Sequence, residues 1–415
     1  MSQQSSSAPL ISPESIAVVK ATAPVVAQHA LEITKTFYPI MFKNNPEALQ
    51  FFNKTNQQRG RQPQALANAV IAFASNIESL GNLANAVDVI AHKHCGLNVL
   101  PEHYQIVEKN IMIAIKEVLG EAITPEVGAA WKEAITALSK ILYTREEELY
   151  KQAESRPGGW RGWKEFEIVE KNEIAEGTMY IKMSPVEGRG TNFHFTAGQF
   201  ITIQCPELEQ GNPRHYTIVS PPGANYFAIA VKRCTAPPDA PEGTSDGVVS
   251  NHLFKLPVGS KVNLSPPFGM FGIEAAIKAA KPIMLLSAGC GGNTARAHMY
   301  TLRKEEALKK VMAVHQDHQR SSHAWSSDYD DINHFFKYTL EDSEAFAKGH
   351  ISQNDLLKAC ESAGVDPSEV LVFLCGPLGF MADVTGHLDA LGVPKDHIIA
   401  EVFGPQLATP DLPLH

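Results

Sequence analysis

The chain has 415 residues, a length that suggests two or three domains. With 44% hydrophobic and 20% charged residues, its composition is that of an ordinary globular protein. The formal net charge of −9 argues against nucleic acid as the main partner, and no apolar run approaches the roughly 18 residues that a membrane-spanning helix needs.

The first residues, "MSQQSSSAPLISPES", lack the basic and apolar regions of a secretory signal. They also lack the arginines of a transit peptide. The six cysteines are scattered without a close-spaced pair, a spacing that suits neither a disulfide framework nor a zinc site. These features predict a protein of the reducing cytoplasm.

Residues 13–153 have the pattern of successive helices, with few strand signals. Four prolines fall where helices are expected to begin or break: Pro46, Pro63, Pro101 and Pro125. Proline suits only the first turn of a helix, so a helix that begins well before Pro63 would kink there. The stretch "ESRPGGWRGW", residues 154–163, ends the helical pattern and predicts a domain boundary.

Short segments of alternating apolar residues follow, bounded by Gly and Pro, and they predict an antiparallel sheet or barrel. They are "KEFEIVEKNEI", "TMYIKMSPV", "FITIQCPEL", "RHYTIVSPP" and "YFAIAVKRC". Residues 236–247, "APPDAPEGTSDG", are expected to form a mobile loop. Beyond residue 275, "KPIMLLSAG" and "EVLVFLCGP" are continuous apolar runs, each followed by a helical stretch, as in buried parallel strands of an α/β domain.

One histidine of "NAVDVIAHKHCGL" is predicted to point inward. Val87, Ile90 and His94 fall on one helical stripe, whereas His92 and Lys93 lie about 200° and 100° further round and are expected near solvent. A lone inward histidine is more often a hydrogen-bonded core residue than a ligand, so this helix alone leaves both interpretations open.

Four other polar residues continue apolar stripes in this region: Tyr38, Gln62, Tyr104 and Glu146. Each of them singly also fits an ordinary core position or a helix end. A buried glutamate is costly unless something binds it. Taken with His94, the set predicts a shared target, and an axially ligated haem iron supplies one.

Longer motifs carry a resemblance to a known family. The segments "FYPIMFKNNPE", "ALANAVIAFASNIESL", "IAHKHCGLNVLPEHYQIV" and "YTREEELY" closely resemble the globin domain of flavohaemoglobins. The segments "PGGWRGW", "RHYTIVS", "GVVSNHL", "LCGPLGFM" and "VFGP" resemble the reductase half of the same family, so the resemblance covers nearly the whole chain.

The resemblance implies that His94 is the proximal ligand of a haem iron. Tyr104 and Glu146 match the hydrogen-bonded pair behind that histidine, with Glu146 reaching its far nitrogen. Such a bond gives the imidazole anionic character and pushes electron density onto the iron.

The same resemblance implies that Tyr38 and Gln62 are the distal pair that hydrogen-bonds iron-bound oxygen. Leu66 matches a leucine over the distal face of the iron, and Lys93 matches a lysine that tunes the redox potential. Cys95 has no role that the sequence assigns.

The motif "RHYT" resembles the Arg-x-Tyr-Ser/Thr motif of ferredoxin-reductase-like flavin domains. Arg214 is suited to the flavin pyrophosphate, Tyr216 to the isoalloxazine ring and Thr217 to its N5. His215 stands where the family often has glutamine, and Phe200 matches an aromatic residue that borders the flavin. Without the later motifs, "RHYT" would equally suit an ordinary strand with a surface arginine.

The segment "GVVSN", residues 247–251, opens a predicted helix whose free N–H groups suit the FAD pyrophosphate. The residues expected to bind there are Gly247, Val249 and Ser250.

The segment "SAGCGGNTARAHM" follows an apolar strand and opens a helix, as a nucleotide-binding loop does. Asn293 or Thr294 is expected to cap that helix. The family usually has Gly-x-Gly-x-Thr-Pro here, and Ala295 stands where proline is expected, so nucleotide binding should persist but weaken. The predicted contacts are Gly289, Cys290, Gly291, Gly292, Asn293 and Thr294.

Two later motifs complete the predicted nucleotide side. The first, "LCGPLGFM", contributes Cys375 and Gly376. The second, "EVFGP", places Phe403 where the resembled family has an aromatic residue over the flavin, and the expected contacts are Val402, Phe403, Gly404 and Pro405. In "HQDHQRSSHAW", His318 or Arg320 could contact a 2′-phosphate, but the segment does not decide between NADH and NADPH.

The predicted fold is therefore multidomain: an all-α globin domain over residues 10–153, an antiparallel β-barrel FAD domain over 159–272 and an α/β nucleotide-binding domain over 275–415, the last two ferredoxin-reductase-like. The implied cofactors are haem b, FAD and NADH or NADPH. The expected partners are small molecules, with no nucleic acid and no membrane span, and a monomer is expected.

The resemblance implies a nitric oxide dioxygenase for NO detoxification: NAD(P)H reduces FAD, FAD reduces the haem, and haem-bound oxygen converts nitric oxide to nitrate. Two alternatives stay open. One is an NAD(P)H-dependent haem or oxygen reductase on the same scaffold. The other is an oxygen- or NO-binding sensor globin whose reductase is weakened, which the altered loop at residues 289–295 would favour.

Overall fold

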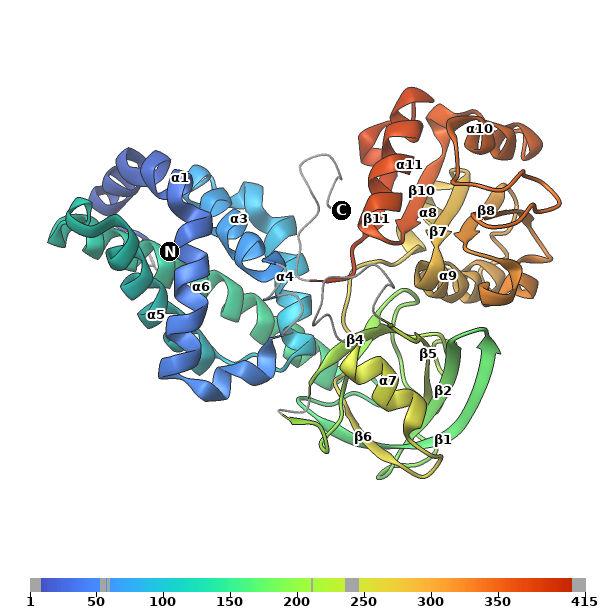
Figure 1. The fold of residues 1–415 in the computed structure, drawn as a ribbon, viewed down its shortest axis with the longest axis horizontal. Helices are drawn as coiled ribbons and strands as arrows, with labels where there is room; N and C mark the ends of the chain where they lie inside the picture. Colours follow the sequence, from blue (N-terminus) through green and yellow to red (C-terminus); the bar gives the residue numbers. More distant parts are fainter. Residues whose placement is uncertain (1–8, 53–56, 58–59, 210–211, 236–245, 405–415) are drawn as a thin grey trace, which may run out of the picture. The chain divides into compact units, whose positions relative to one another are not determined.

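The computed structural model describes residues 9–52, 57, 60–209, 212–235 and 246–404. Contacts divide the chain into two compact units, and the main boundary between them lies between residues 150 and 151. The first unit is helical, and the second contains two sheets (Figure 1). The predicted mobile loop at 236–247 lies outside the described residues except for its last two positions.

The helical unit is built from α1 (Pro13–Asn44), α3 (Arg61–Ser75), α4 (Ala84–Gly96), α5 (Pro101–Leu119) and α6 (Pro125–Ser155), with short 3-10 turns between them. Three prolines occupy first positions as predicted, because Pro46 opens a 3-10 turn, Pro101 opens α5 and Pro125 opens α6. Pro63 is the third residue of α3, so no kink is required there.

Helix α1 is the one described helix that is long and apolar enough, by length and composition alone, to cross a membrane. Core helices of globular proteins pass the same test. Here Val19, Ile33 and Phe37 on one face of α1 belong to the apolar core of the helical unit, together with Phe73 and Trp131 from later helices. The composition of α1 therefore does not establish a membrane span.

The second unit begins with an antiparallel sheet of six strands in the order β4-β3-β6-β1-β2-β5. Its strands are β1 (Lys164–Ala175), β2 (Thr178–Pro185), β3 (Phe200–Gln204), β4 (Arg214–Thr217), β5 (Phe227–Lys232) and β6 (Lys261–Leu264). Val219, just after β4, donates to the carbonyl of Ala228 in β5 at 2.8 Å, so the two ends of the sheet approach each other. Strand β6 was not predicted, because its four residues follow no long alternating run.

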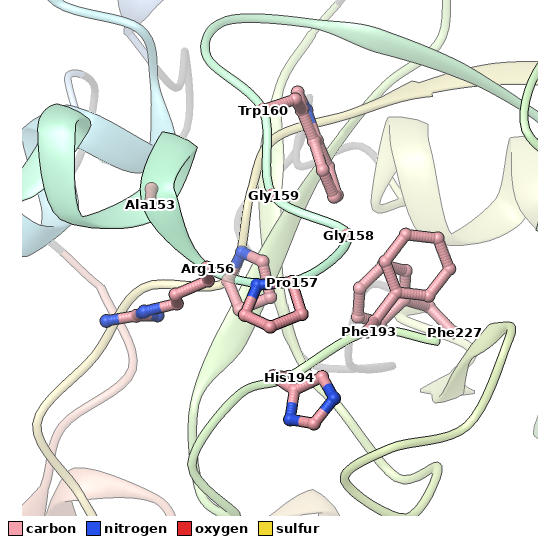
Figure 2. Close-up of a pocket in the computed structure, with 10 residues that line it drawn as sticks. Ala153, Arg156, Pro157, Gly158, Gly159, Trp160, Phe193, His194 and Phe227 are labelled. Atoms are coloured by element: carbon pink, nitrogen blue, oxygen red, sulfur yellow. The ribbon is translucent and has the colours of Figure 1, made fainter. Parts of the chain in front are cut away.

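The segment before β1 packs on the sheet through one indole. Trp160 lies against Phe166, Phe193 and Phe227, and the last two rings stack at 4.5 Å between centroids. A cavity of about 10 Å³, the size of one water, lies beside these rings (Figure 2). A Cβ on Gly159 would stand 2.0 Å from the carbonyl oxygen of Ala153, so only glycine fits this bend.

The parallel sheet has five strands in the order β11-β10-β7-β8-β9. They are β7 (Ile283–Ala288), β8 (Val311–Asp317), β9 (Asn333–Tyr338), β10 (Leu371–Cys375) and β11 (Ile398–Glu401). The helices of this part are α8 (Glu274–Ala279), α9 (Gly292–Lys304), α10 (Gln353–Ser362) and α11 (Leu378–Ala390). The two apolar runs predicted as parallel strands are β7 and β10, and they pair with each other.

Candidate functional site

Three helices bring a histidine, a tyrosine and a glutamate together. His94 lies in the last turn of α4, Tyr104 in the first turns of α5, and Glu146 on α6. The hydroxyl of Tyr104 donates to Oε1 of Glu146 at 2.5 Å. The same oxygen lies 2.8 Å from Nδ1 of His94, and the Tyr104 oxygen lies 2.9 Å from that nitrogen. The contacts among His94, Tyr104 and Glu146 are those that the resemblance implied, and the role of His94 as an iron ligand stays a prediction.

The protonation of this cluster follows from its surroundings. Burial, followed by the charge of Glu146, raises the pKa of Tyr104, so its phenol keeps the proton that it donates. A carboxylate can only accept, so Nδ1 of His94 carries its proton toward Glu146. Glu146 is 1% exposed, and its Oε2 has no hydrogen-bond partner among the described residues.

His94 also lines a pocket of about 110 Å³ with mostly apolar walls. The other lining side chains come from Met41, Glu47, Ala48, Gln50, Phe51, Phe52, Val99, His103, Tyr104, Ile106 and Val107. Because Nδ1 is engaged behind the ring, Nε2 is the nitrogen left to serve as a ligand. An imidazole held by a carboxylate beside an apolar pocket fits an axially ligated haem.

Tyr38 on α1 and Gln62 on α3 form a side-chain hydrogen bond in the same helical unit. Tyr38 is 5% exposed, and this burial raises the pKa of its phenol despite the bond from Gln62. The rings of Phe37 and Phe52 contact it at 4.8 and 5.4 Å. Leu66, one turn beyond Gln62, packs against the same core. The two residues predicted as a distal pair are therefore paired.

The prediction that His92 lies near solvent was wrong. His92 is 9% exposed and buried, while Lys93 is half-buried and His94 keeps 34% of its side chain exposed. Helical phase alone could not show that the face of α4 carrying His92 would also be covered. The thiol of Cys95 donates to the backbone carbonyl of Glu146 at 3.5 Å, which links α4 to α6.

The predicted flavin motif forms β4, paired with β3. Phe200 lies opposite Thr217, and Ile201 opposite Tyr216. His215 lies 4.5 Å from the ring of Phe200, and its Nδ1 is 2.7 Å from the Thr202 hydroxyl.

Two members of this motif are largely enclosed. Burial lowers the pKa of Arg214 and raises that of Tyr216, and the phenol lies within electrostatic range of the guanidinium. The strand thus presents a cation, a phenol ring and the hydroxyl of Thr217 in sequence, which are the groups that a flavin requires.

Helix α7 (Val248–Lys255) begins after Gly247, as predicted. A Cβ on Gly247 would stand 2.7 Å from Cys234 Cβ and 2.7 Å from Ser250 Oγ. The start of α7 therefore packs closely against the segment that follows β5. Val249 and Ser250 are buried in the first turn. The side chain of Lys171 donates to three carbonyls at the opposite end of α7, those of Leu253, Phe254 and Leu256, at 2.9, 3.0 and 2.5 Å.

The nucleotide loop follows β7 as predicted, with a 3-10 turn at Gly289–Gly291 before α9. The expectation that Asn293 or Thr294 caps α9 was wrong. Gly291 is the cap position, and no side chain accepts from the first turn. Asn293 donates to the carbonyl of Ala230 at 3.0 Å and accepts from the indole of Trp325 at 2.9 Å. Asn293 therefore links the nucleotide loop to Ala230 and Trp325 and does not cap the helix.

Close packing shapes this loop. The hydroxyl of Thr294 donates to the carbonyl of Gly291 at 2.8 Å and also bonds the thiol of Cys375. A Cβ on Gly291 would stand 2.1 Å from the Cys375 carbonyl, and one on Gly292 would stand 3.1 Å from the His315 ring. Cys290 is exposed at the surface of the loop.

The remaining nucleotide-side residues lie at strand ends. Cys375 ends β10, and Gly376 follows it, packed against Phe380. Val402 is buried just after β11, and Phe403 is 43% exposed. Gly404 is exposed with φ 124°. Pro405 lies outside the described residues.

Sequence reasoning missed the cluster at the end of β8. Asp317 is 6% exposed and lies 3.1 Å from the ammonium of Lys232 on β5. His315 bonds Ser287 at 2.8 Å and stacks on His323 at 4.2 Å between ring centroids. The strand went unrecognised because "HQD" reads as polar, although all seven residues of β8 are buried. Its signal was the apolar "VMAV" before it.

Comparisons with known proteins agree with this architecture. Residues 35–142 match the Globin family and residues 165–273 match the Oxidoreductase FAD-binding domain. The chain is 36% identical over 404 residues to Flavohemoprotein A of Dictyostelium discoideum, covering 95% of this chain and 98% of that one. It is 37% identical over 403 residues to a flavohemoprotein of Rhizobium meliloti, covering 94% and 97%.

The chain belongs to the flavohemoprotein family. A solved flavohemoglobin from Malassezia yamatoensis, with bound FAD and heme, superposes with a TM-score of 0.79 at 26% identity, covering 95% of this chain and all of that one. The FAD/NAD-binding domain of a nitric oxide dioxygenase from Vibrio cholerae superposes with a TM-score of 0.50 at 26% identity, covering 58% of this chain and 99% of that one.

This flavohemoprotein is an oxidoreductase with a globin domain and an FAD-binding domain. Its antiparallel and parallel sheets form the reductase half, which suits an NAD(P)H-dependent enzyme. Among the described residues, no group of three or more His, Cys, Asp or Glu side chains could hold a metal ion.

Proposed function

We propose that this flavohemoprotein is a nitric oxide dioxygenase that uses NAD(P)H, FAD and haem. When bound, these groups supply electron transfer from the nicotinamide to oxygen and the conversion of nitric oxide to nitrate. The balance is one NAD(P)H oxidised for two nitric oxide and two oxygen molecules consumed and two nitrate ions formed. The observation that carries the proposal is the hydrogen-bonded His94–Glu146–Tyr104 cluster on a chain that also contains a reductase half.

His94 would hold the haem through Nε2. Glu146 accepts a hydrogen bond from Nδ1–H at 2.8 Å, and this bond makes the imidazole a stronger electron donor than a histidine bonded to a neutral carbonyl. Tyr104 fixes the carboxylate by donating to the same oxygen at 2.5 Å. A haem held in this way would supply a more electron-rich iron than one held by a histidine bonded to a carbonyl.

Tyr38 and Gln62 would supply hydrogen-bond donors to the oxygen ligand. The phenol of Tyr38 keeps its proton because burial raises its pKa. Gln62 bonds that phenol and so fixes its orientation. As donors, both would stabilise negative charge placed beside them.

In the reductase half, Arg214, Tyr216 and Thr217 would hold FAD together with the first turn of α7. The loop from Gly289 to Thr294 would receive the nicotinamide dinucleotide, with Cys375 beside it. The structure describes all six cysteines and none is in a disulfide, which is compatible with our proposal of a reducing cytoplasm as the place of action. The domain limits 10–153, 159–272 and 275–415 stay predictions.

The test is turnover by the purified full-length chain. We expect a Soret band together with flavin bands, and NAD(P)H oxidation that starts when nitric oxide is added in the presence of oxygen. Nitrate should equal the nitric oxide consumed. NAD(P)H oxidation that yields superoxide or peroxide without nitrate would overturn the proposal in favour of an oxygen reductase. A haem signal with no NAD(P)H oxidation would favour a sensor.

A further inference from the structure

Side chains on one face of α9 join this helix to the antiparallel sheet. Asn293, Arg296 and Tyr300 follow one another at i, i+3 and i+7, so they lie on the same side of the helix. Asn293 donates to the carbonyl of Ala230 in β5 at 3.0 Å, and Tyr300 donates to the carbonyl of Val219 at 3.1 Å. A terminal nitrogen of Arg296 also donates to the Val219 carbonyl. All of these residues belong to the second compact unit.

The guanidinium of Arg296 is held on several sides. Its Nε lies 2.7 Å from Oδ2 of Asp328, and 15% of the arginine side chain is exposed. The guanidinium carbon lies 4.0 Å from the centre of the Trp325 ring and 5.0 Å from that of Tyr300. The Tyr300 hydroxyl accepts from the guanidinium at 2.5 Å. A planar group that is paired, stacked and hydrogen-bonded in this way has one fixed orientation.

The indole against this guanidinium is itself fixed. Trp325 has φ 71° and ψ 13°, a left-handed conformation that bulky residues rarely adopt. Its Nε1 donates to Oδ1 of Asn293 at 2.9 Å, and its ring meets Tyr180 of β2 edge-on at 6.3 Å between centroids. The strained backbone therefore occurs where an indole supports α9 and contacts the antiparallel sheet.

The residue that receives these bonds continues the flavin motif. Val219 follows Thr217 by two residues, and its own N–H donates to Ala228 of β5 at 2.8 Å. A carbonyl oxygen has two lone pairs, and Arg296 and Tyr300 each donate to that of Val219. The backbone just beyond β4 is therefore fixed through both of its polar groups.

Arg296 is also close to the nucleotide loop. It lies four residues beyond Gly292, where α9 begins, and so about 6 Å along the helix from the end of the loop. The guanidinium thus joins the strand end proposed to border the flavin to the helix start proposed to bind the dinucleotide.

The separation of these two sites matters for the reaction between their ligands. In hydride transfer a C–H bond of the dihydronicotinamide breaks and both of its electrons pass with the hydrogen to the flavin, so the nicotinamide is oxidised and the flavin is reduced. The reacting atoms must lie about 3–3.5 Å apart, and a misplacement of about 1 Å costs about 100-fold in rate.

We propose that Arg296 is a positioning residue that sets the distance between nicotinamide and flavin, by fixing α9 to the Val219 carbonyl. The inference rests on the proposed function, because it assumes that residues 214–217 hold the flavin and that the loop before α9 receives the dinucleotide. Arg296 acts through the backbone that it joins. The bond from Asn293 to Ala230 remains without it, so the loop should still bind its ligand.

The test is anaerobic stopped-flow reduction of the flavin in the full-length enzyme by NADH and by NADPH, which needs neither oxygen nor nitric oxide. The native chain is compared with Arg296→Met, Tyr300→Phe and Arg303→Met. Tyr300→Phe is the milder variant, because it removes one bond to Val219 and keeps the ring.

Arg303→Met is the matched control. Arg303 lies on the same side of α9 as Arg296 and binds the carboxylate of Asp331 at 2.7 and 2.9 Å. Its other bond, to the backbone carbonyl of Asp328, is 2.5 Å long. Among the described residues, its side-chain bonds therefore anchor α9 to the segment that holds Arg296 and none reaches the antiparallel sheet.

We expect Arg296→Met to lower the limiting rate of flavin reduction by about 10- to 100-fold, while the dinucleotide Kd changes by less than about threefold and FAD content stays native. Deuterium at C4 of the nicotinamide should still slow the reaction, because the transfer itself is impaired. The charge-transfer absorbance of NAD⁺ with reduced flavin, an equilibrium measure of ring contact, should weaken. Tyr300→Phe should lower the limiting rate by about 2- to 5-fold, and Arg303→Met by less than about twofold.

A native limiting rate in Arg296→Met, whatever its melting temperature, would overturn the proposal and leave Arg296 as a support of the fold. An equal loss of rate in Arg303→Met would overturn it too, because any anchor of α9 would then serve. So would a raised Kd with an unchanged limiting rate, which would make Arg296 a binding residue. If Arg296→Met does not fold, a native rate and native charge-transfer absorbance in Tyr300→Phe decide against the proposal.

The proposed function fails separately from this inference. Absence of nitrate in the dioxygenase assay, with flavin reduction in the variants as expected, would sink the proposed function and leave the role of Arg296 standing.

Discussion

Replacement of Glu146 by glutamine tests whether the proximal cluster drives turnover. The glutamate oxygen Oε1 now receives two charge-assisted hydrogen bonds, at 2.5 Å from Tyr104 and at 2.8 Å from His94. Charge-assisted bonds contribute about 1.5–3 kcal/mol and neutral ones about 0.5–1.5, so each bond loses roughly 1–1.5 kcal/mol in Glu146→Gln. The two together lose about 2–3 kcal/mol.

That loss converts into a rate at about 1.4 kcal/mol for each factor of ten. If the imidazole passes the whole of it to the iron, kcat for nitric oxide consumption falls by about 30- to 140-fold, at or just above the upper end of the roughly 10- to 100-fold usual for residues behind a metal ligand. Haem occupancy should change little, because Nε2 of His94 is untouched. The amide NH₂ would enter the place of Oε2, which has no partner among the described residues, and should cost about 1–3 kcal/mol of stability.

The assay is stopped-flow consumption of nitric oxide, with the Soret absorbance per chain as the measure of haem. Glu148→Gln is the matched control, since Glu148 lies on the same helix with 57% of its side chain exposed and pairs with Arg145 at 2.8 Å. Its turnover should stay within about twofold of the native value, as for most exposed pairs. Turnover of Glu146→Gln within about threefold of native, with full haem, would refute the reasoning.

Three further predictions follow from described contacts. His94→Ala should lose haem and keep the flavin, and a normal Soret band in that variant would remove His94 from its role. Lys171→Met removes three hydrogen bonds from the end of α7, so FAD should dissociate about 5- to 30-fold more readily on dilution. Flavin fluorescence measures this release, and the Soret band should not change. Equal FAD retention would contradict the link between α7 and flavin binding. Burial lowers the pKa of His298 to about 4 and of His323 to about 2, so both are neutral when folded and charge on unfolding below about pH 6.5. Their contribution to the free energy of unfolding is therefore complete above about pH 6.5, and each histidine loses about 1.4 kcal/mol of it per pH unit as the pH falls. Urea unfolding of the reductase unit between about pH 7 and 5 should show this slope, and His298→Asn should reduce it. A free energy of unfolding that does not change with pH would count against the prediction.

Most of the fold could be predicted from the spacing of apolar residues and from the positions of Gly and Pro. Helical phase selected His94, and the apolar runs of β7 and β10 marked the parallel sheet, because both depend on local patterns. The cluster around His94 needed more than phase. Tyr104 and Glu146 lie on separate helices, and only the resemblance to a family joined them before their distances were known.

Other features depended on neighbours that are distant in sequence. Asn293 has the residue type of a helix cap, yet its amide bonds Ala230 and Trp325, which no local rule foresees. The burial of His92 likewise depends on what packs over α4. Strand β8 was missed because its end is polar. Asp317 is buried there because donors from elsewhere, such as Lys232 on another sheet, satisfy its carboxylate. Polar residues inside a strand become interpretable only when their partners are placed.

The bend at Gly159 has a practical consequence for dividing the chain. Trp160 lies on Phe193 and Phe227, so these aromatic rings are part of the reductase core although their partner precedes the first strand. A reductase fragment that began at Lys164 would lack this indole and expose both rings to water. A fragment starting at or before Ala153 would retain them. The start point of a recombinant half is therefore set by an aromatic contact, and a protease that cut between Trp160 and Lys164 would produce a less soluble piece than one that cut upstream.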